Sequence, residues 1–292
     1  MKQLLLFFII VLLTNNTHSQ DLEAILEQES TDSLQLVFGT FNGTRLLNGH
    51  SVETRNKGIL EFLISHRFGR LNSGFDEFFG LDDSNIRFGF EYAFTDQLTL
   101  AVGRSSFEKT YDGYIKYRLL RQKTGSRPSP LSLTLFGSTT IRTIDDFEPG
   151  NEPTFSERLT YTGQALLARK FGPHLSVQLS PTFVHFNTVE TPQDPHNMFI
   201  MGVGTRVKIS KRVSLNGEYF YNANPLESLN VKNSVAFGVD IETGGHIFQL
   251  IVTNAVSMVE KGFLAESTGD FFSGDIHFGF NISRAFQIKK TP

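Results

Sequence analysis

The feature that most constrains this chain is an alternation of apolar and polar side chains with a period of two residues. It is clearest in the closing segment, where apolar residues occupy even positions and small or polar residues occupy odd ones. The even positions hold Ile276, Phe278, Phe280, Ile282, Arg284, Phe286 and Ile288, and the odd ones begin with His277, Gly279 and Asn281. Because successive side chains of a β-strand point to opposite faces, this pattern predicts a strand with one apolar and one polar face.

The same alternation recurs upstream, giving about twelve segments of roughly ten residues each between Gly58 and the end of the chain. Tight turns such as Thr95–Gln97 and Thr243–Gly245 alternate with longer connections, for example Thr143 to Phe155 and Ser257 to Phe272. This organisation is typical of an antiparallel up-and-down β-barrel that crosses an outer membrane, with short turns in the periplasm and long loops outside the cell. The expected fold class is therefore all-β, a transmembrane barrel.

A soluble β-sandwich also alternates with a period of two and is the main alternative fold. The barrel is favoured because the segments exceed the average of about five to six residues found for strands in globular proteins. No apolar stretch after Ser19 reaches the ~20 residues that a membrane-spanning helix requires. The absence of Cys excludes a disulfide scaffold and a Cys-anchored lipoprotein, and the net charge of −3 argues against a nucleic-acid partner.

The N-terminal residues 1–19 have the layout of a secretory signal peptide. Lys2 supplies a positive charge, an unbroken apolar run extends from Leu4 to Leu13, and a small residue, Ser19, precedes the expected cleavage site. The apolar run is about half as long as a membrane-spanning helix. We therefore expect an exported protein whose mature chain begins at or near Gln20.

After the signal peptide, residues 20–32 form an N-terminal segment without an assigned function, and residues 33–292 form the barrel. Leu34 to Phe41 is an additional candidate strand that would make the strand count odd, unless a weaker segment such as Thr160 to Ala168 is not a full strand. Residues 69–84 carry apolar side chains at roughly helical spacing. This stretch is expected to form a short insert in the lumen or on the periplasmic side.

Two parts of the chain resemble a known family. His66 to Gln122, with Gly103 to Gly113 as its most specific part, and the closing Asp275 to Gln287 are similar to a family of bacterial outer-membrane β-barrel proteins of unknown function. The resemblance implies a barrel located in the bacterial outer membrane. It implies no catalytic or ligand-binding residues, because none is established for that family.

The alternation also predicts which charged side chains face the lumen. They are Arg87, Glu91, Lys116, Arg118, Arg206, Lys208, Glu218, Asp240 and Glu242. The lipid-facing set of the closing strand is Ile276, Phe278, Phe280, Ile282 and Phe286. One interpretation is that the lumen charges form salt bridges that close the interior. The other is a narrow water-filled path between a basic wall (Lys116 to Arg118, Arg206 to Lys208) and an acidic wall (Glu218 to Glu242).

The leading functional hypothesis is a non-enzymatic channel or uptake barrel for small solutes, with no cofactor. The eight His residues show no i+2 or i+4 pairing, so no metal site is expected. The alternatives are a structural barrel that anchors a periplasmic complex and, less favoured, a lipid hydrolase that would use a Ser-His pair near His185 or His277. Expected partners are outer-membrane lipid, the barrel-assembly machinery and, for the anchoring alternative, a periplasmic protein.

Overall fold

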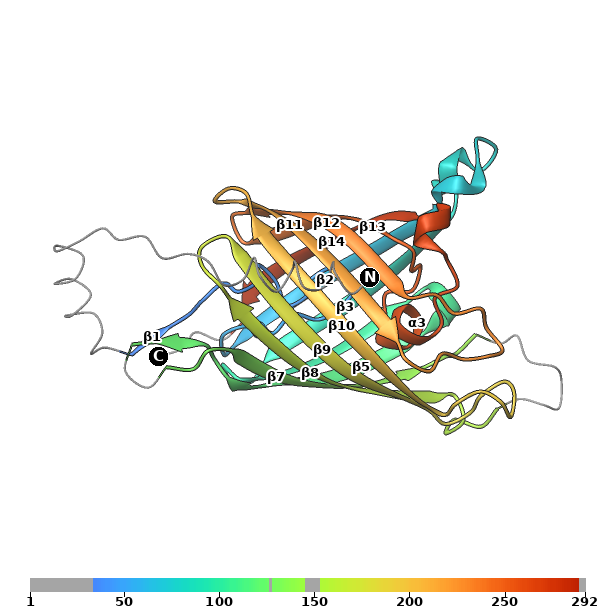
Figure 1. The fold of residues 1–292 in the computed structure, drawn as a ribbon, viewed down its shortest axis with the longest axis horizontal. Helices are drawn as coiled ribbons and strands as arrows, with labels where there is room; N and C mark the ends of the chain where they lie inside the picture. Colours follow the sequence, from blue (N-terminus) through green and yellow to red (C-terminus); the bar gives the residue numbers. More distant parts are fainter. Residues whose placement is uncertain (1–33, 126–127, 145–152, 289–292) are drawn as a thin grey trace, which may run out of the picture.

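The computed structural model describes residues 34–125, 128–144 and 153–288, and the expected signal peptide and residues 20–32 lie outside this part. Twelve antiparallel strands close into one barrel, in which β14 pairs with β2 (Figure 1). The barrel strands are β2 (Ile59–Arg70), β3 (Ser84–Ala93), β4 (Leu98–Ser105), β5 (Tyr111–Leu120), β7 (Ser132–Ile141), β8 (Leu159–Lys170), β9 (Leu175–Phe186), β10 (Asn197–Lys208), β11 (Val213–Asn222), β12 (Ser234–Thr243), β13 (His246–Thr253) and β14 (His277–Gln287).

Residues that alternate in the sequence with a period of two form the outer face and the lumen face of the barrel wall. In β5, Tyr111, Ile115 and Tyr117 are exposed on the outer face, whereas Asp112 and Lys116 are buried on the lumen side. An apolar outer surface suits contact with lipid, because lipid cannot hydrogen-bond polar side chains. Within the described residues, no helix has both the length and the apolar character needed to cross a membrane.

The two ends of the barrel differ. At one end, called here the short-turn end, β3–β4, β8–β9, β10–β11 and β12–β13 are joined by tight turns. The opposite long-loop end carries most of the longer connections, including residues 254–276 between β13 and β14. Two connections break the expected alternation of short and long. The connection at residues 106–110 is short although it lies at the long-loop end. The connection at residues 121–131 is longer although it lies at the short-turn end, and it contains β6 (Lys123–Thr124).

The structure resolves the strand count. Residues 34–41 contribute no barrel strand: only β1 (Gln35–Leu36) is extended and paired there, and it pairs with β6 in a separate two-stranded sheet. Thr160 to Ala168 lies within β8, a full strand of 12 residues. The barrel therefore has an even number of strands, and the start of β2 and the end of β14 both lie at the short-turn end.

The insert expected at residues 69–84 lies outside the lumen. Between β2 and β3 the chain forms two short 3-10 turns, η1 (Leu71–Ser73) and η2 (Phe78–Gly80), which project from the long-loop end (Figure 1). Phe75 is 77% exposed, and Phe79 has a positive φ of 56°, which interrupts a regular helix. The helical spacing of the apolar residues therefore does not produce a helix packed in the lumen, which corrects that expectation.

Ile282 and Phe286 allow a matched test of the outer face, because both lie on β14 with the same parity. Ile282→Arg places a charge near the middle of the strand and should reduce the folding free energy in a lipid bilayer by about 2–4 kcal/mol. Phe286→Arg lies near the short-turn end and should cost about 0–1 kcal/mol. Urea titrations in lipid vesicles measure both; equal losses would contradict the assignment of this face to lipid.

Candidate functional site in the barrel lumen

The lumen is occupied by a segment of the chain that precedes β2. Residues 37–57, called here the plug, run into the barrel from the short-turn end and return to it. The innermost part is a hairpin in which Arg45 pairs with His50, and the Leu46 amide donates to the Gly49 carbonyl at 2.9 Å. Nearly all side chains between residues 40 and 54 are buried. The two ends of the plug therefore share one mouth of the barrel.

The acidic side of the lumen binds the tip of the hairpin through its backbone. Glu218 in β11 accepts hydrogen bonds from the backbone amides of Leu47 (2.9 Å), Asn48 (2.9 Å) and Gly49 (3.1 Å). These amides lie at a turn and have no partner within a sheet, so the carboxylate satisfies donors that would otherwise be buried unpaired.

The basic side of the lumen binds plug carbonyl groups in the same way. Lys116 Nζ in β5 donates to the carbonyl oxygens of Thr44 (3.1 Å), Ser51 (2.9 Å) and Glu53 (2.7 Å), which uses all three ammonium hydrogens. The Lys116 side chain has no exposed surface. A buried ammonium group is stable only with such partners, so Lys116 and the plug depend on each other.

Two further wall residues contact the plug on either side of the hairpin. Arg206 in β10 donates to the carbonyl oxygens of Gly39 (3.0 Å) and Thr40 (3.3 Å), near the mouth. The Gln178 amide in β9 accepts from the Val52 amide and donates to the His50 carbonyl, both at 2.7 Å. Wall residues from several strands thus hold the plug along its length.

Glycines in the wall provide space for two leucines of the plug. A Cβ atom added to Gly204 in β10 would collide with the Leu46 side chain, and one added to Gly238 in β12 would lie 2.5 Å from Leu47 Cδ2. The contact explains why these inward-facing positions carry no side chain. Apolar packing therefore supplements the polar contacts of the hairpin.

A second element fills the lumen from the long-loop end. The connection between β13 and β14 folds inward and forms α3 (Glu260–Ala265), all of whose residues are buried (Figure 1). Glu260 Oε1 lies 3.1 Å from Arg45 Nη1 and 3.1 Å from His50 Nε2 of the plug. An ion pair between Arg45 and Glu260, with the His50 ring beside it, therefore joins the plug to α3 in the middle of the barrel.

The predicted lumen charges are placed as follows. Arg87, Glu91, Lys116, Arg118, Arg206, Glu218 and Asp240 are buried on the lumen side, while Lys208 is half-buried and Glu242 exposed at the short-turn mouth. Arg87 pairs with Asp112, and Tyr114 donates to Glu91.

The basic residues do not form one wall. Arg206 in β10 is separated from Lys116 by β7, β8 and β9, and instead lies on the strand next to β11, which β12 follows; β11 carries Glu218 and β12 carries Asp240. Asn42 of the plug connects these strands: it accepts from Arg206 at 2.5 Å and donates to Asp240 at 3.3 Å. The arrangement is thus a mixed charged lining around the plug, not two opposing walls.

The predicted lipid-facing residues of the closing strand lie on its outer parity. Phe278, Phe280 and Ile282 are half-buried, Phe286 is exposed, and Ile276 immediately precedes β14. The intervening residues, such as Asn281, are buried toward the plug, where the Asn281 amide donates to the Leu47 carbonyl at 2.9 Å.

The histidines considered for hydrolase chemistry make other contacts. His185 Nδ1 lies 2.8 Å from the Asn197 side-chain oxygen, and His277 Nδ1 lies 2.8 Å from the Phe68 carbonyl. Neither of these ring nitrogens contacts a serine. Within the described residues there is also no group of three His, Asp or Glu side chains arranged to bind a metal ion.

The closed barrel, with an apolar outer face and a charged interior, defines a transmembrane β-barrel. The chain belongs to the family described as the membrane-bound beta barrel domain (DUF5777), which matches residues 41–286 and so includes most of the plug. The protein is accordingly a β-barrel of the bacterial outer membrane.

Solved structures similar to this chain include outer-membrane channels. The NanC porin is 9% identical, with a TM-score of 0.48 over 78% of this chain and 98% of the porin. The KdgM porin is 10% identical, with a TM-score of 0.45 over 77% of this chain and 99% of the porin. An outer-membrane channel from Pseudomonas putida F1 is 12% identical, with a TM-score of 0.48 over 84% of this chain and all (100%) of the channel. Among curated proteins, none matches this chain.

Lys116 and Lys170 provide a matched test of how the plug is held. Lys116→Met removes the donor of three buried plug carbonyls, whereas Lys170→Met removes one hydrogen bond to the Phe38 carbonyl at the mouth. Since the chain has no Cys, Ser51→Cys introduces a single buried thiol in the plug. Lys116→Met should raise the labelling rate of this thiol by about tenfold or more, and Lys170→Met should change it little. Equal rates in the two variants would contradict the proposed anchoring.

His50 gives the plug a defined pH dependence. The ring is packed among Arg45, Tyr114, Phe136 and Glu260, with Lys116 and Arg87 nearby. Burial, followed by the charges of Arg45, Lys116 and Arg87, holds the pKa of His50 well below its usual value. The plugged state therefore binds fewer protons than a state in which His50 is hydrated. Its stability is fully present above about pH 6.5 and decreases as the pH falls below that value.

Fluorescence can detect this loss, because the chain has no Trp. Phe41→Trp places a single tryptophan at a buried plug position, where it can be excited selectively over the tyrosines. Its emission should shift to longer wavelength as the pH falls from about 7 to 5. Adding His50→Gln should remove most of the shift while leaving the other lumen carboxylates unchanged. A shift of the same size with Gln at position 50 would show that another group controls the transition.

Proposed function

We propose that this protein is a channel that rests in a closed state, and that withdrawal of the plug toward the short-turn end opens a path for small polar solutes. A barrel of twelve strands has an interior wider than wall side chains alone fill. Here the plug and α3 occupy that interior. The proposal combines the two interpretations of the lumen charges: they close the barrel at rest and line a path when the plug leaves.

The observation that carries the proposal is that wall charges bind the backbone of the plug. Glu218, Lys116 and Arg206 direct their hydrogen bonds to plug amides and carbonyls. When the plug leaves, water can take over these bonds, so neither the wall nor the plug retains unpaired polar groups. A plug packed mainly through apolar side chains would leave an apolar surface that excludes water.

The course of the plug also favours withdrawal. Both of its ends lie at the short-turn end, where the Lys170 ammonium contacts the Phe38 carbonyl and the Thr54 hydroxyl contacts the Asp96 carbonyl. The hairpin can therefore leave through one mouth without threading a chain end through the barrel. The short-turn end is the periplasmic end in outer-membrane barrels, so a periplasmic event would control opening.

The uncovered lining would suit polar solutes of either charge. Arg67, Lys116 and Arg206 face the interior together with Glu218 and Asp240. Such a mixed lining has no single dominant sign and would select mainly by size and hydrogen bonding. The chain would then act in transport without catalysing a reaction.

A second candidate, a barrel that anchors a periplasmic partner, is favoured by one observation. Leu34, Leu36 and Phe38 are exposed beside the β1–β6 sheet at the short-turn end, where an apolar surface could bind another protein. Under this alternative the plug would be a permanent part of the fold, and no change in the plug would produce conductance.

Planar-bilayer recordings distinguish the two candidates. Glu218→Gln weakens acceptance from three plug amides, and Glu242→Gln removes the same charge from an exposed position at the mouth. We expect rare openings in the wild type, an open probability at least about tenfold higher in Glu218→Gln, and wild-type behaviour in Glu242→Gln.

A reversible cross-link between the plug and the wall completes the test. Asn42 and Ser214 are joined by a hydrogen bond of 2.8 Å between plug and wall. Cysteines at both positions, joined by a short reducible thiol cross-linker, should abolish openings, and reduction should restore them. Each single-cysteine variant serves as its control. Conductance that persists through the cross-linked plug, or a folded Glu218→Gln protein that never opens, would contradict the channel proposal.

A further inference from the structure

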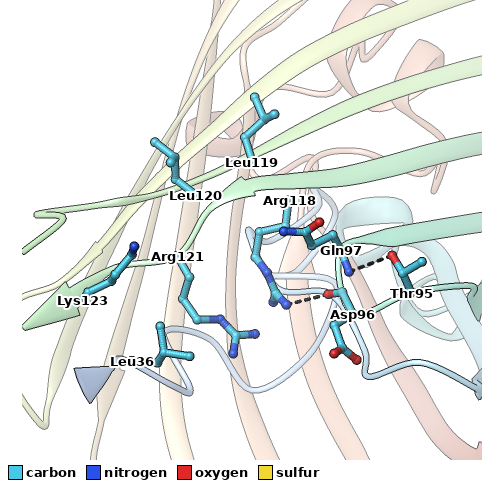
Figure 2. A pocket seen from close by; sticks show the side chains of 9 residues that line it. All are labelled: Leu36, Thr95, Asp96, Gln97, Arg118, Leu119, Leu120, Arg121 and Lys123. Atoms are coloured by element: carbon cyan, nitrogen blue, oxygen red, sulfur yellow. Dashed lines mark hydrogen bonds between the residues drawn. The ribbon is translucent and has the colours of Figure 1, made fainter. Parts of the chain in front are cut away.

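A pocket of about 480 Å³ lies at the short-turn end of the barrel. It is bounded by the end of β5, the turn Thr95–Gln97 and the residues that lead to β6 (Figure 2). Its lining combines three cations, Arg118, Arg121 and Lys123, with apolar side chains that include Leu36, Leu119 and Leu120. This combination of charges and apolar side chains suits an anion that has an apolar neighbour.

Arg118 is a buried cation in the lining of this pocket. Its side chain is only 7% exposed, and Nη2 donates to the Asp96 carbonyl at 2.5 Å. The second terminal nitrogen, Nη1, is buried without a hydrogen-bond partner among the described residues. No hydrogen bond to a carboxylate therefore neutralises this guanidinium group within the described residues, and its charge remains at the edge of the pocket.

Arg121 is directed into the same space. Arg118 and Arg121 both line the pocket, and Figure 2 shows their side chains among the residues that surround it. The Phe38 ring supports Arg121 from one side, with 4.5 Å between Cζ and the ring centroid. Two guanidinium groups that line one pocket repel each other, and a bound anion offsets this repulsion. Their forked N–H donors match the oxygens of a phosphate group.

The acidic group nearest the pocket does not neutralise it. Asp96 is the one acid in its lining, and its Oδ1 accepts from the Lys57 backbone amide at 2.8 Å. Three cations therefore face one carboxylate that is already engaged. The local charge favours a bound anion.

We propose that Arg118 and Arg121, assisted by Lys123, bind a phosphate group at the periplasmic rim of the barrel. The group could belong to a phospholipid, because Leu119 (44% exposed) and Leu120 (46% exposed) offer an apolar surface beside the cations for an acyl chain. It could also be free inorganic phosphate. This site requires no movement of the plug, and Phe38 at the start of the plug contributes to it by packing on Arg121.

Arg169 provides the matched control. It is an exposed arginine at the same end of the barrel and stacks on Phe171 with 5.0 Å between Cζ and the ring centroid, much as Arg121 stacks on Phe38. It does not line the pocket. Arg121→Gln and Arg169→Gln therefore remove the same charge, but only Arg121→Gln removes it from the pocket. Arg118→Gln is a second site variant, for which folding is checked by resistance to unfolding in detergent gels.

The experiment uses the purified full chain after removal of bound lipid. One arm titrates inorganic phosphate by calorimetry, and the other measures retention of phosphatidylglycerol against uncharged diacylglycerol by native mass spectrometry. We expect Arg121→Gln and Arg118→Gln to weaken binding by about tenfold or more and Arg169→Gln to leave it unchanged. Binding of phosphate without the lipid would identify a soluble ligand, and binding of the phospholipid but not diacylglycerol would identify a lipid. Binding of neither, or equal weakening by Arg169→Gln, would overturn the proposal.

Discussion

Inside a closed barrel, a charged side chain that has lost its water must form hydrogen bonds with another group, and this requirement links the wall to the plug. Lys116 and Glu218 are buried on strands that lie across the lumen from each other, and each is satisfied by three backbone groups of the plug. The plug supplies both donors and acceptors because every peptide unit carries one of each. A short irregular segment can therefore satisfy a lining of both signs.

The plug also explains features of the wall that have no role in an empty barrel. The glycines at 204 and 238 make room for Leu46 and Leu47 of the hairpin. Glu260, brought inward by α3, meets Arg45 and His50 at the centre of the lumen. Closure thus depends on two elements that reach the middle of the barrel from opposite ends. Movement of the plug must break the contact with α3 as well as the contacts with the wall.

The barrel could be predicted from the sequence because the two faces of a strand are a local property, visible in alternating residues such as Phe280 and Asn281. The plug could not. Its contacts join residues that are far apart, for example Leu47 with Glu218, 171 positions away, and its own sequence has no sustained periodicity. The alternation in Leu34 to Phe41 suggested a strand, but only Gln35 and Leu36 pair, and Phe41 is buried with the plug. The spacing of apolar residues in 69–84 predicted an insert in the lumen or on the periplasmic side, whereas these residues project from the long-loop end.

Hydrogen exchange of the plug amides, read by mass spectrometry in lipid vesicles at neutral pH, tests the central claim most directly. The amides of Leu46, Leu47, Asn48 and Ser51 are hydrogen-bonded to the hairpin or to Glu218 within the closed lumen. They should exchange far more slowly than an unstructured peptide, with protection approaching that of the barrel strands. Exchange of these amides at the rate of an unstructured peptide, with the strands still protected, would show that the plug does not occupy the lumen.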